Sequence, residues 1–287
     1  MLFQTVFRKE RYDSEKESYL KYMEIKKADI DGGKAFDWGR TSGDYAKFRD
    51  IYPAAFYDAV LRRGFCTAGQ KCLDLGTGTG VLPRNLYHAG AGWCGTDISP
   101  EQIAQAKQLA SAAGMQIDFR TASAETTDYP DESFDTVTAC QCYWYFDPEK
   151  AYRNIARMLK PGGSLVLLYM GWLSEEDRIA AASEEIVLKY NPGWTGAGDR
   201  RHLIAPPAQA EQYFETAEQT MFDLPVHFTR ENWHGRMRAC RGVGASLEPE
   251  QLKAWDAEHM QMLMQNAPAE FDILHYAAMT VLQKRNV

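Results

Sequence analysis

The sequence lacks long apolar runs, an excess of positive charge and any paired cysteine motif. Its longest apolar run, Leu165 to Met170, is the length of a strand, whereas a membrane-spanning helix needs about 20 apolar residues. The net charge of −7 argues against a general nucleic-acid binder, which needs basic surface to release counterions. We therefore expect no membrane segment and no nucleic-acid partner, and we expect the protein to be cytoplasmic.

Cysteine is present but not in a pattern that carries chemistry. The six cysteines are Cys66, Cys72, Cys94, Cys140, Cys142 and Cys240. None has the spacing of a zinc site, and one residue between Cys140 and Cys142 is too few for a CxxC redox pair. Most of them stand in or beside apolar strand-like runs, where cysteine behaves as a small hydrophobe. We expect buried free thiols and no bound metal.

From residue 71 onward, the signals for strands and helices alternate. The predicted strands are 71–75, 93–97, 116–121, 134–142 and 164–170, one within 216–228, and 271–282. The predicted helices are 81–88, 99–114, 147–160, 174–190, 230–240 and 249–266. This alternation predicts an α/β fold with a doubly wound, mostly parallel sheet. The last strand follows inserted helices, so we expect the end of the sheet to be locally antiparallel.

The pattern predicts one domain with additions. Residues 1–40 form an N-terminal helical extension, with a predicted helix over 14–27, and residues 41–287 form the catalytic domain. Material that could form a lid lies within 172–265. Two helix starts are well marked. Ser99 is a cap followed by a proline, with Gln102 placed to close a capping box, and Asp147 is also a cap followed by a proline.

Three glycines at alternate positions, Gly76, Gly78 and Gly80, follow the first of these strands in the segment LDLGTGTG. In an open α/β sheet, ligands bind at the carboxyl ends of the strands. A phosphate-binding P-loop is excluded because no GK[ST] ending follows, and the spacing differs from the G-x-G-x-x-G of dinucleotide folds. Asp74 precedes the turn and would repel a pyrophosphate, but a carboxylate suits a ligand with positive charge.

A second carboxylate, Asp97, ends the next strand about twenty residues after the glycines. At this position a carboxylate can accept hydrogen bonds from both ribose hydroxyls, which indicates a nucleoside but would also suit NAD. The glycine spacing and Asp74 favour S-adenosylmethionine, whose sulfonium and amino groups are cationic.

Four segments in this order, LDLGTGTG, GTDIS, FDTVTACQC and RMLKPGGSLVLL, lie within residues 71–170. Together they resemble the class I S-adenosylmethionine-dependent methyltransferases, in particular the small-molecule "methyltransferase type 11" group. The resemblance implies a Rossmann-like seven-stranded sheet with the last strand antiparallel. It also implies an enzyme that methylates a small molecule, most often at oxygen or nitrogen, and releases S-adenosylhomocysteine. An in-line displacement of this kind needs mainly alignment and exclusion of water.

The resemblance also implies a set of cofactor-binding residues. They are Tyr45, Arg49, Asp74, Gly76, Thr77, Gly78, Asp97, Ile98, Ala124, Glu125 and Gln141. By family position the glycine turn would hold the methionine end, and Asp97 would bind the ribose. Ile98, Ala124 and Glu125 would surround the adenine, while Gln141 would lie beside the sulfonium. Tyr45 and Arg49 match a Y-x-x-x-R segment that meets the cofactor carboxylate, although an amphipathic helix with a solvated arginine explains them equally well.

The acceptor side is less specific, because a base is needed only when the acceptor must lose a proton. The candidate bases are His202, His234 and His275, since histidine titrates in the useful range. The candidate acceptor-binding residues are Trp38, Tyr143, Trp172, Arg236 and Arg238. They would suit an aromatic or carboxylate-bearing molecule, although the arginines could instead pair with nearby acids. A non-catalytic cofactor-binding module and an NAD-dependent oxidoreductase stay open as alternatives, and so does the choice between monomer and homodimer.

Overall fold

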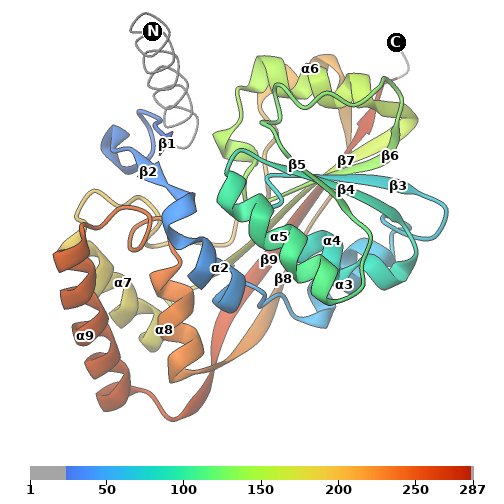
Figure 1. Ribbon diagram of the computed structural model, residues 1–287. Helices are drawn as coiled ribbons and strands as arrows, with labels where there is room; N and C mark the ends of the chain where they lie inside the picture. Colours follow the sequence, from blue (N-terminus) through green and yellow to red (C-terminus); the bar gives the residue numbers. More distant parts are fainter. Residues whose placement is uncertain (1–23, 286–287) are drawn as a thin grey trace, which may run out of the picture.

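The computed structural model describes residues 24–285, and its body is a seven-stranded sheet (Figure 1). The strands of this sheet are β3 (Lys71–Leu75), β4 (Gly92–Asp97), β5 (Asp118–Thr121), β6 (Phe134–Cys140), β7 (Leu159–Trp172), β8 (Phe214–Thr229) and β9 (Glu270–Lys284). Their order is β5-β4-β3-β6-β7-β9-β8. β3 to β7 pair in parallel, and β9 lies antiparallel between β7 and β8. The Rossmann-like sheet with a reversed last strand is therefore confirmed.

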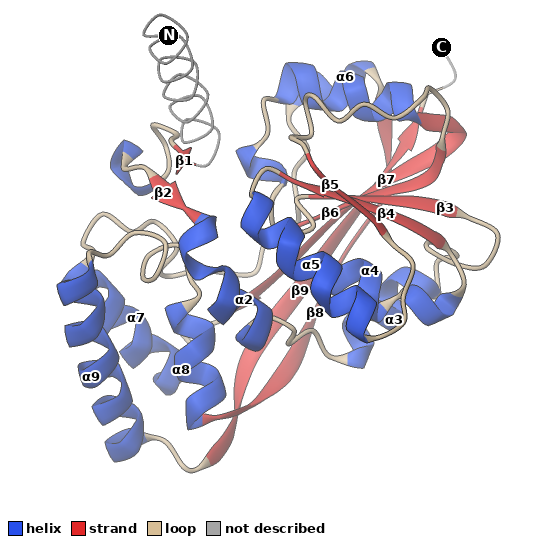
Figure 2. Ribbon diagram, viewed as in Figure 1, coloured by secondary structure: helices blue, strands red, loops and turns tan. Residues whose placement is uncertain are grey.

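Helices cover both faces of the sheet (Figure 2). The α-helices are α2 (Ser42–Phe48), α3 (Ala54–Leu61), α4 (Val81–Asn85), α5 (Pro100–Ala112), α6 (Pro148–Met158), α7 (Arg178–Tyr190), α8 (Arg230–Arg238) and α9 (Pro249–Asn266). Short 3₁₀ turns are η1 (Asp31–Gly33), η2 (Trp38–Thr41), η3 (Tyr87–Ala89), η4 (Tyr143–Tyr145) and η5 (Ala208–Gln212). In Figure 1, α3, α4 and α5 lie on one face and α6 on the other. The helix α3 was not among the predicted elements.

Of the two predicted helix starts, one agrees with the prediction in full and the other lacks the expected capping box. Asp147 caps α6 as predicted, accepting hydrogen bonds from the N–H groups of Glu149 and Lys150. At α5, the Ser99 side chain accepts from Gln102 N, but Gln102 does not close a capping box. Its Nε2 donates to Trp38 O at 3.4 Å, and the Ser99 N–H donates to Asp97. Gln102 lines the cavity described below.

The N-terminal extension contains strand where a helix was predicted. Most of the predicted helix over 14–27 falls outside the described residues, but its end forms β1 (Glu24–Ile25), which pairs antiparallel with β2 (Phe36–Asp37). Phe36 is 2% exposed and packs with Ile30 and Ala245. Packing against distant residues outweighs local helix preference here.

Three helices gather beside the carboxyl ends of the strands, next to α2 (Figure 1). α7 lies between β7 and β8 in sequence, and α8 and α9 lie between β8 and β9. Their common core contains Trp233 and Trp255, which are both fully buried. We call α7, α8 and α9 the helical cap. Within residues 24–285, none of the helices has the length and apolar character that a bilayer span requires.

Candidate functional site

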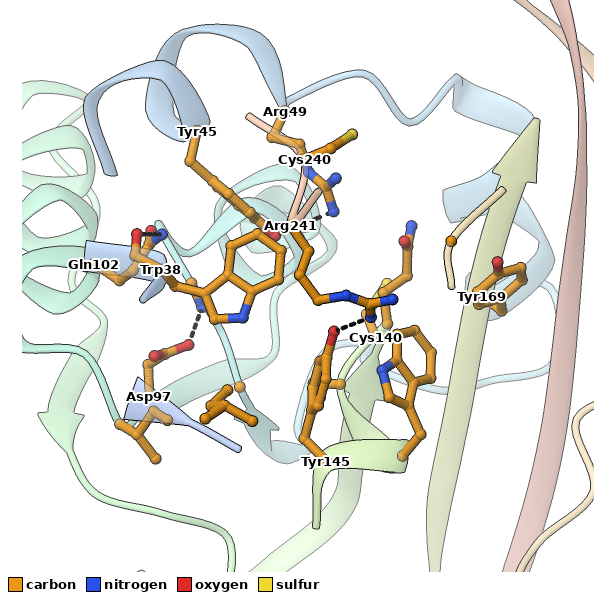
Figure 3. A pocket seen from close by; sticks show the side chains of 18 of the residues that line it. Trp38, Tyr45, Arg49, Asp97, Gln102, Cys140, Tyr145, Tyr169, Cys240 and Arg241 are labelled. Atoms are coloured by element: carbon orange, nitrogen blue, oxygen red, sulfur yellow. Dashed lines mark hydrogen bonds between the residues drawn. The ribbon is translucent and has the colours of Figure 1, made fainter. Parts of the chain in front are cut away.

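A cavity of about 330 Å³ lies at the carboxyl ends of the parallel strands (Figure 3). Its walls are the turn after β3, the ends of β4, β6 and β7, and residues of α2 and of the helical cap. Of the predicted cofactor-binding residues, those that line it are Tyr45, Arg49, Gly76, Gly78, Asp97, Ile98, Ala124, Glu125 and Gln141. Segments that are far apart in the sequence thus meet at one hollow.

The glycine turn brings backbone close to this cavity. Gly76, Gly78 and Gly80 all have positive φ, at 60°, 55° and 75°, a conformation that glycine adopts at no steric cost. A Cβ at Gly76 would lie 2.7 Å from the Cβ and Sγ of Cys142, and one at Gly78 would lie 3.3 Å from the ring of Tyr45. The alternate spacing therefore reflects a turn that has no room for side chains at its pocket face.

Asp97 is held in place by the same turn. Its Oδ2 accepts a hydrogen bond from Gly78 N at 2.9 Å, and its Oδ1 accepts from Ser99 N at 2.9 Å. Burial raises the pKa of Asp97, and these backbone N–H groups oppose that rise. A carboxylate has about four lone-pair sites, so Asp97 keeps acceptor capacity toward the cavity. Figure 3 shows it on the pocket wall below Gln102 and Trp38.

Gln141, at the end of β6, has a strained backbone. Its φ is 56°, a value that is uncommon for residues other than glycine. Backbone strain of this kind is often found at functional sites. Its N–H donates to Leu168 O at 2.9 Å, and its Nε2 donates to Tyr52 Oη at 2.9 Å. Cys140, which also contacts Tyr52, and Cys142 line the cavity on either side.

The flap formed by α2 covers the glycine turn. Tyr45 packs on Gly78, and the Arg49 guanidinium lies 4.7 Å from the centroid of the Tyr45 ring. Arg49 Nη2 also lies 3.4 Å from Tyr45 Oη. Both side chains point into the cavity from above the turn in Figure 3.

The far end of the cavity is aromatic. Trp144, Tyr145, Tyr169, Trp172 and Trp194 all line it. Such walls with a few polar groups are typical of a small-molecule site.

One carboxylate, Asp199, stands among these rings. Its Oδ2 accepts hydrogen bonds from Tyr169 Oη at 2.6 Å and from Tyr276 Oη at 3.2 Å. Tyr169 could have been noticed at the carboxyl end of a predicted strand. Asp199 lies in a loop with no local signal, so only tertiary structure reveals it.

Some predicted residues lie elsewhere. Asp74 is 2% exposed, and it accepts from Thr138 Oγ1 at 2.6 Å rather than lining the cavity. Burial raises the pKa of Asp74 to about 7. Thr77, within the turn, is also buried and does not line the cavity. On the acceptor side, Trp38, Trp172 and Arg236 line the cavity, but Tyr143 and Arg238 do not.

None of the three candidate bases lines the cavity. His202 lies behind Asp199, with Nδ1 2.7 Å from Tyr276 Oη. His234 is in the helical cap, where its Nδ1 lies 2.9 Å from Nδ1 of His259. His275 is fully buried, and its Nδ1 donates to Ile273 O at 2.8 Å. Burial lowers the pKa of His275 to about 3.

The fold and the site define an α/β protein with a cavity at the carboxyl edge of its sheet, which is where open α/β folds bind their ligands. Comparison with known proteins makes the class more specific. Residues 73–167 match the family model described as methyltransferase domain. An uncharacterized methyltransferase of Mycobacterium tuberculosis is 31% identical over 147 residues, which cover 49% of this chain and 57% of that protein. The chain thus spans little more than half the length of this relative.

Two further similarities extend over more of the chain. The ubiquinone biosynthesis O-methyltransferase of Aliivibrio fischeri is 27% identical over 193 residues, 67% of this chain and 81% of that protein. The crystal structure of the YcgJ protein from Bacillus subtilis superposes with a TM-score of 0.50 at 18% identity, covering 82% of this chain and 100% of that one. Residues 73–167 therefore carry a methyltransferase domain, and the chain resembles the class I S-adenosylmethionine-dependent methyltransferases.

Proposed function

We propose that the protein transfers the methyl group of S-adenosylmethionine to a small-molecule acceptor, at oxygen or nitrogen. The observation that carries this proposal is the continuity of the cavity. The turn with Gly76 and Gly78, together with Asp97, lines one end, and the aromatic walls around Tyr169 and Trp172 line the other. A nucleoside site and an apolar site in one hollow bring two reactants into contact, which is the main requirement of methyl transfer.

The residues present fit the proposed cofactor. Asp97 keeps free lone pairs for ribose hydroxyls, the glycine turn leaves no Cβ in the way, and Arg49 has no carboxylate partner within residues 24–285. Arg49 with Tyr45 would hold the cofactor carboxylate, and Ile98, Ala124 and Glu125 would surround the adenine. When bound, the cofactor supplies an electrophilic methyl group.

The chain itself contributes orientation and exclusion of water. The α2 flap closes over the glycine turn, and the Gln141 amide is oriented by Tyr52 at the junction of the two ends. Asp199 is placed to accept a proton at a carboxylate oxygen when the acceptor is a hydroxyl or an amine. An enclosed apolar site of this kind strengthens each of these polar contacts.

The test combines binding with turnover. Purified protein is incubated with methyl-labelled S-adenosylmethionine and a metabolite extract, and labelled products are identified by mass. S-adenosylhomocysteine binding is measured by calorimetry for the wild type, for Asp97→Ala and for Asp58→Ala, an exposed residue paired with Arg62 outside the cavity.

We expect Asp97→Ala to lose about 1–3 kcal/mol of binding free energy, the scale of hydrogen bonds to a charged group, and Asp58→Ala to lose none. Equal affinity of both variants, or NADH binding in place of S-adenosylhomocysteine, would contradict the cofactor assignment. Cofactor binding without any labelled product would contradict the proposed activity and favour a regulatory module.

A further inference from the structure

Arg236, on α8, is a buried cation without a carboxylate partner among residues 24–285. Its side chain lines the cavity, yet the residue is only 3% exposed. Its Nη1 donates to Cys240 Sγ at 3.0 Å, and its guanidinium carbon lies 4.9 Å from the centroid of the Trp172 ring. Its Nε has no hydrogen-bond partner in that part of the chain. A buried charge left in this state is costly unless another group compensates it.

Two neighbouring arginines, in contrast to Arg236, form ion pairs with carboxylates. Arg238 contacts Asp44 and Asp256, and Arg241 contacts Asp31. Neither of these two arginine–carboxylate sets includes Arg236, although all three arginines lie within six residues of sequence. An unpaired Arg236 is therefore a local exception rather than a general shortage of acids.

A second uncompensated guanidinium, that of Arg49, lies on the same cavity. Arg49 makes its side-chain hydrogen bond and its ring contact with Tyr45, and it forms no ion pair with a carboxylate of the described residues. The pKa of Arg236 is lowered first by burial and then by the positive charge of Arg49. Two cations that repel each other, the buried Arg236 and the half-buried Arg49, thus face one hollow. Two anionic groups supplied by ligands would compensate these two charges.

The assignment of these anions rests on the proposed function. The proposed cofactor has one carboxylate, and Arg49 is the arginine nearer to it because Tyr45, its partner, packs on Gly78 of the glycine turn. Arg236 instead packs on Trp172, at the end of β7 and among the aromatic walls. After the cofactor carboxylate is assigned to Arg49, Arg236 still lacks an anion.

We infer that the acceptor is an aromatic or apolar molecule with a carboxylate, and that Arg236 binds this carboxylate against Trp172. The guanidinium keeps one group for an anion in the cavity. Nη1 is occupied by Cys240 and Nε is buried away from the cavity space, which leaves Nη2 to donate to the carboxylate. A hydrogen bond between a guanidinium and a carboxylate is charge-assisted and stronger than a neutral one. Arg236 thereby selects the acceptor and fixes its orientation.

The experiment uses the full chain saturated with S-adenosylhomocysteine, so that the cofactor end and Arg49 are occupied. Benzoate and its neutral counterpart benzamide are titrated by calorimetry into the wild type, Arg236→Met and Arg236→Lys. Arg62→Met, which removes an exposed arginine outside the cavity, is the matched control. Thermal unfolding of each variant shows that it is folded.

We expect the wild type and Arg62→Met to prefer benzoate over benzamide at least tenfold. Arg236→Met should lose this preference, and Arg236→Lys, which keeps the charge but not the planar fork, should retain part of it. Because an uncompensated buried charge is removed, Arg236→Met should not lower the unfolding temperature without ligand.

Three results would overturn the inference. The first is absence of benzoate binding to the saturated wild type. The second is an unchanged preference in Arg236→Met. The third concerns the affinity for S-adenosylhomocysteine alone, which is measured by calorimetry for Arg236→Met and for Arg49→Met. A loss as large in Arg236→Met as in Arg49→Met would mean that Arg236 holds the cofactor. Failure of the wild type to bind S-adenosylhomocysteine at all would instead refute the proposed function, so the two failures are distinguishable.

Discussion

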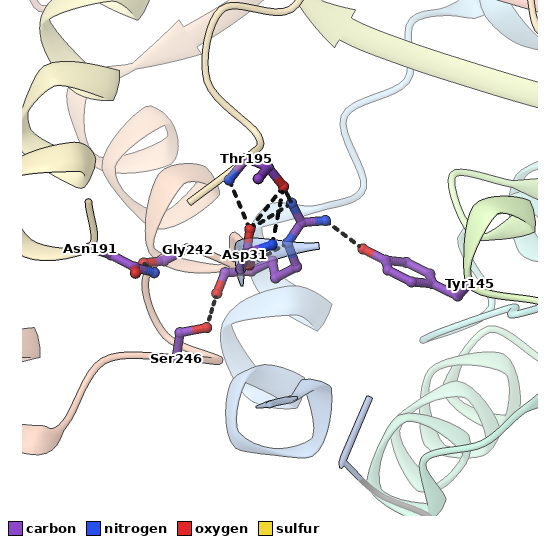
Figure 4. A network of polar contacts seen from close by, with 7 residues as sticks. Asp31, Tyr145, Asn191, Thr195, Gly242 and Ser246 are labelled. Atoms are coloured by element: carbon purple, nitrogen blue, oxygen red, sulfur yellow. Dashed lines mark hydrogen bonds and ion pairs between the residues drawn. The ribbon is translucent and has the colours of Figure 1, made fainter. Parts of the chain in front are cut away.

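Asp31 and Arg241 form a largely buried ion pair across 210 residues of sequence. Figure 4 shows the network of polar contacts around Asp31. Arg241 Nε lies 2.8 Å from Asp31 Oδ2, and Nη2 lies 3.1 Å from Oδ1. Asp31 also accepts from the N–H and hydroxyl of Thr195, and Arg241 donates to Tyr145 Oη on the cavity wall. The pair joins the N-terminal extension, the helical cap and the rim of the site.

Removing one member of this pair should destabilise the protein strongly. Asp31→Ala leaves the largely buried Arg241 guanidinium without its carboxylate, so we expect a loss of up to about 3–5 kcal/mol in unfolding free energy, measured by urea denaturation. The exposed pair of Asp58 and Arg62 is the control, and Asp58→Ala should cost at most about 1 kcal/mol. Similar losses in both variants would show that the Asp31 pair has no special role.

Arg238 should act on the cofactor flap and not on the acceptor. It contacts Asp44 of α2 and Asp256 of α9, so Arg238→Ala should loosen α2 and raise the Kd for S-adenosylhomocysteine several-fold. The Lys47–Glu231 pair also joins α2 to α8 but is exposed, so Lys47→Met should leave this Kd unchanged. An effect of Arg238→Ala on benzoate affinity alone would return Arg238 to the acceptor site.

Replacing two glycines of similar φ with alanine should distinguish the cost of a steric clash from the cost of backbone strain. A Cβ at Gly76 (φ 60°) would lie 2.7 Å from Cys142, whereas a Cβ at Gly162 (φ 73°) would meet nothing within 4 Å. We expect Gly162→Ala to cost only the left-handed strain of roughly 1–2 kcal/mol. Gly76→Ala should cost about 1–3 kcal/mol more and should weaken S-adenosylhomocysteine binding. Equal losses by urea denaturation would mean that Cys142 moves aside freely.

Two buried histidines should make the fold sensitive to acid. Burial lowers the pKa of both His259 and His275 to about 3. Because the unfolded chain takes up these protons near pH 6.5 and the folded chain does not, stability is full above pH 6.5. It should fall as the pH decreases toward 3, by up to about 1.4 kcal/mol per pH unit for each group.

Replacing His275 should flatten this dependence. Urea midpoints at pH 7.5, 5.5 and 4.5 are compared for the wild type, His275→Phe and His275→Gln. Both replacements remove the titrating group, so each should reduce the acid slope by the same amount, whatever its stability at pH 7.5. A slope equal to that of the wild type would show that His275 is protonated in the folded protein.

Much of the fold could be predicted because its signals are local. The strand and helix periods and the Asp147–Pro148 start followed from short stretches of sequence, and the reversed last strand was expected from the order of the elements along the chain. Predictions failed where contacts between distant residues decided the outcome. Gln102 binds Trp38 O instead of closing its capping box, and Ile25 pairs with Phe36 in a strand.

The position of the cavity edge follows from the sequence alone, because in a parallel sheet the turn after one strand and the acid ending the next must meet. Gly76, Gly78 and Asp97 share one cavity wall for that reason. Which arginines are free depends instead on tertiary packing. Arg236 and Arg238 are two residues apart on α8, yet Arg238 meets carboxylates from α2 and α9 while Arg236 meets none within residues 24–285. Whether an arginine finds a carboxylate partner depends on residues far away in sequence, and the packing of the whole helical cap decides which of these residues come near it.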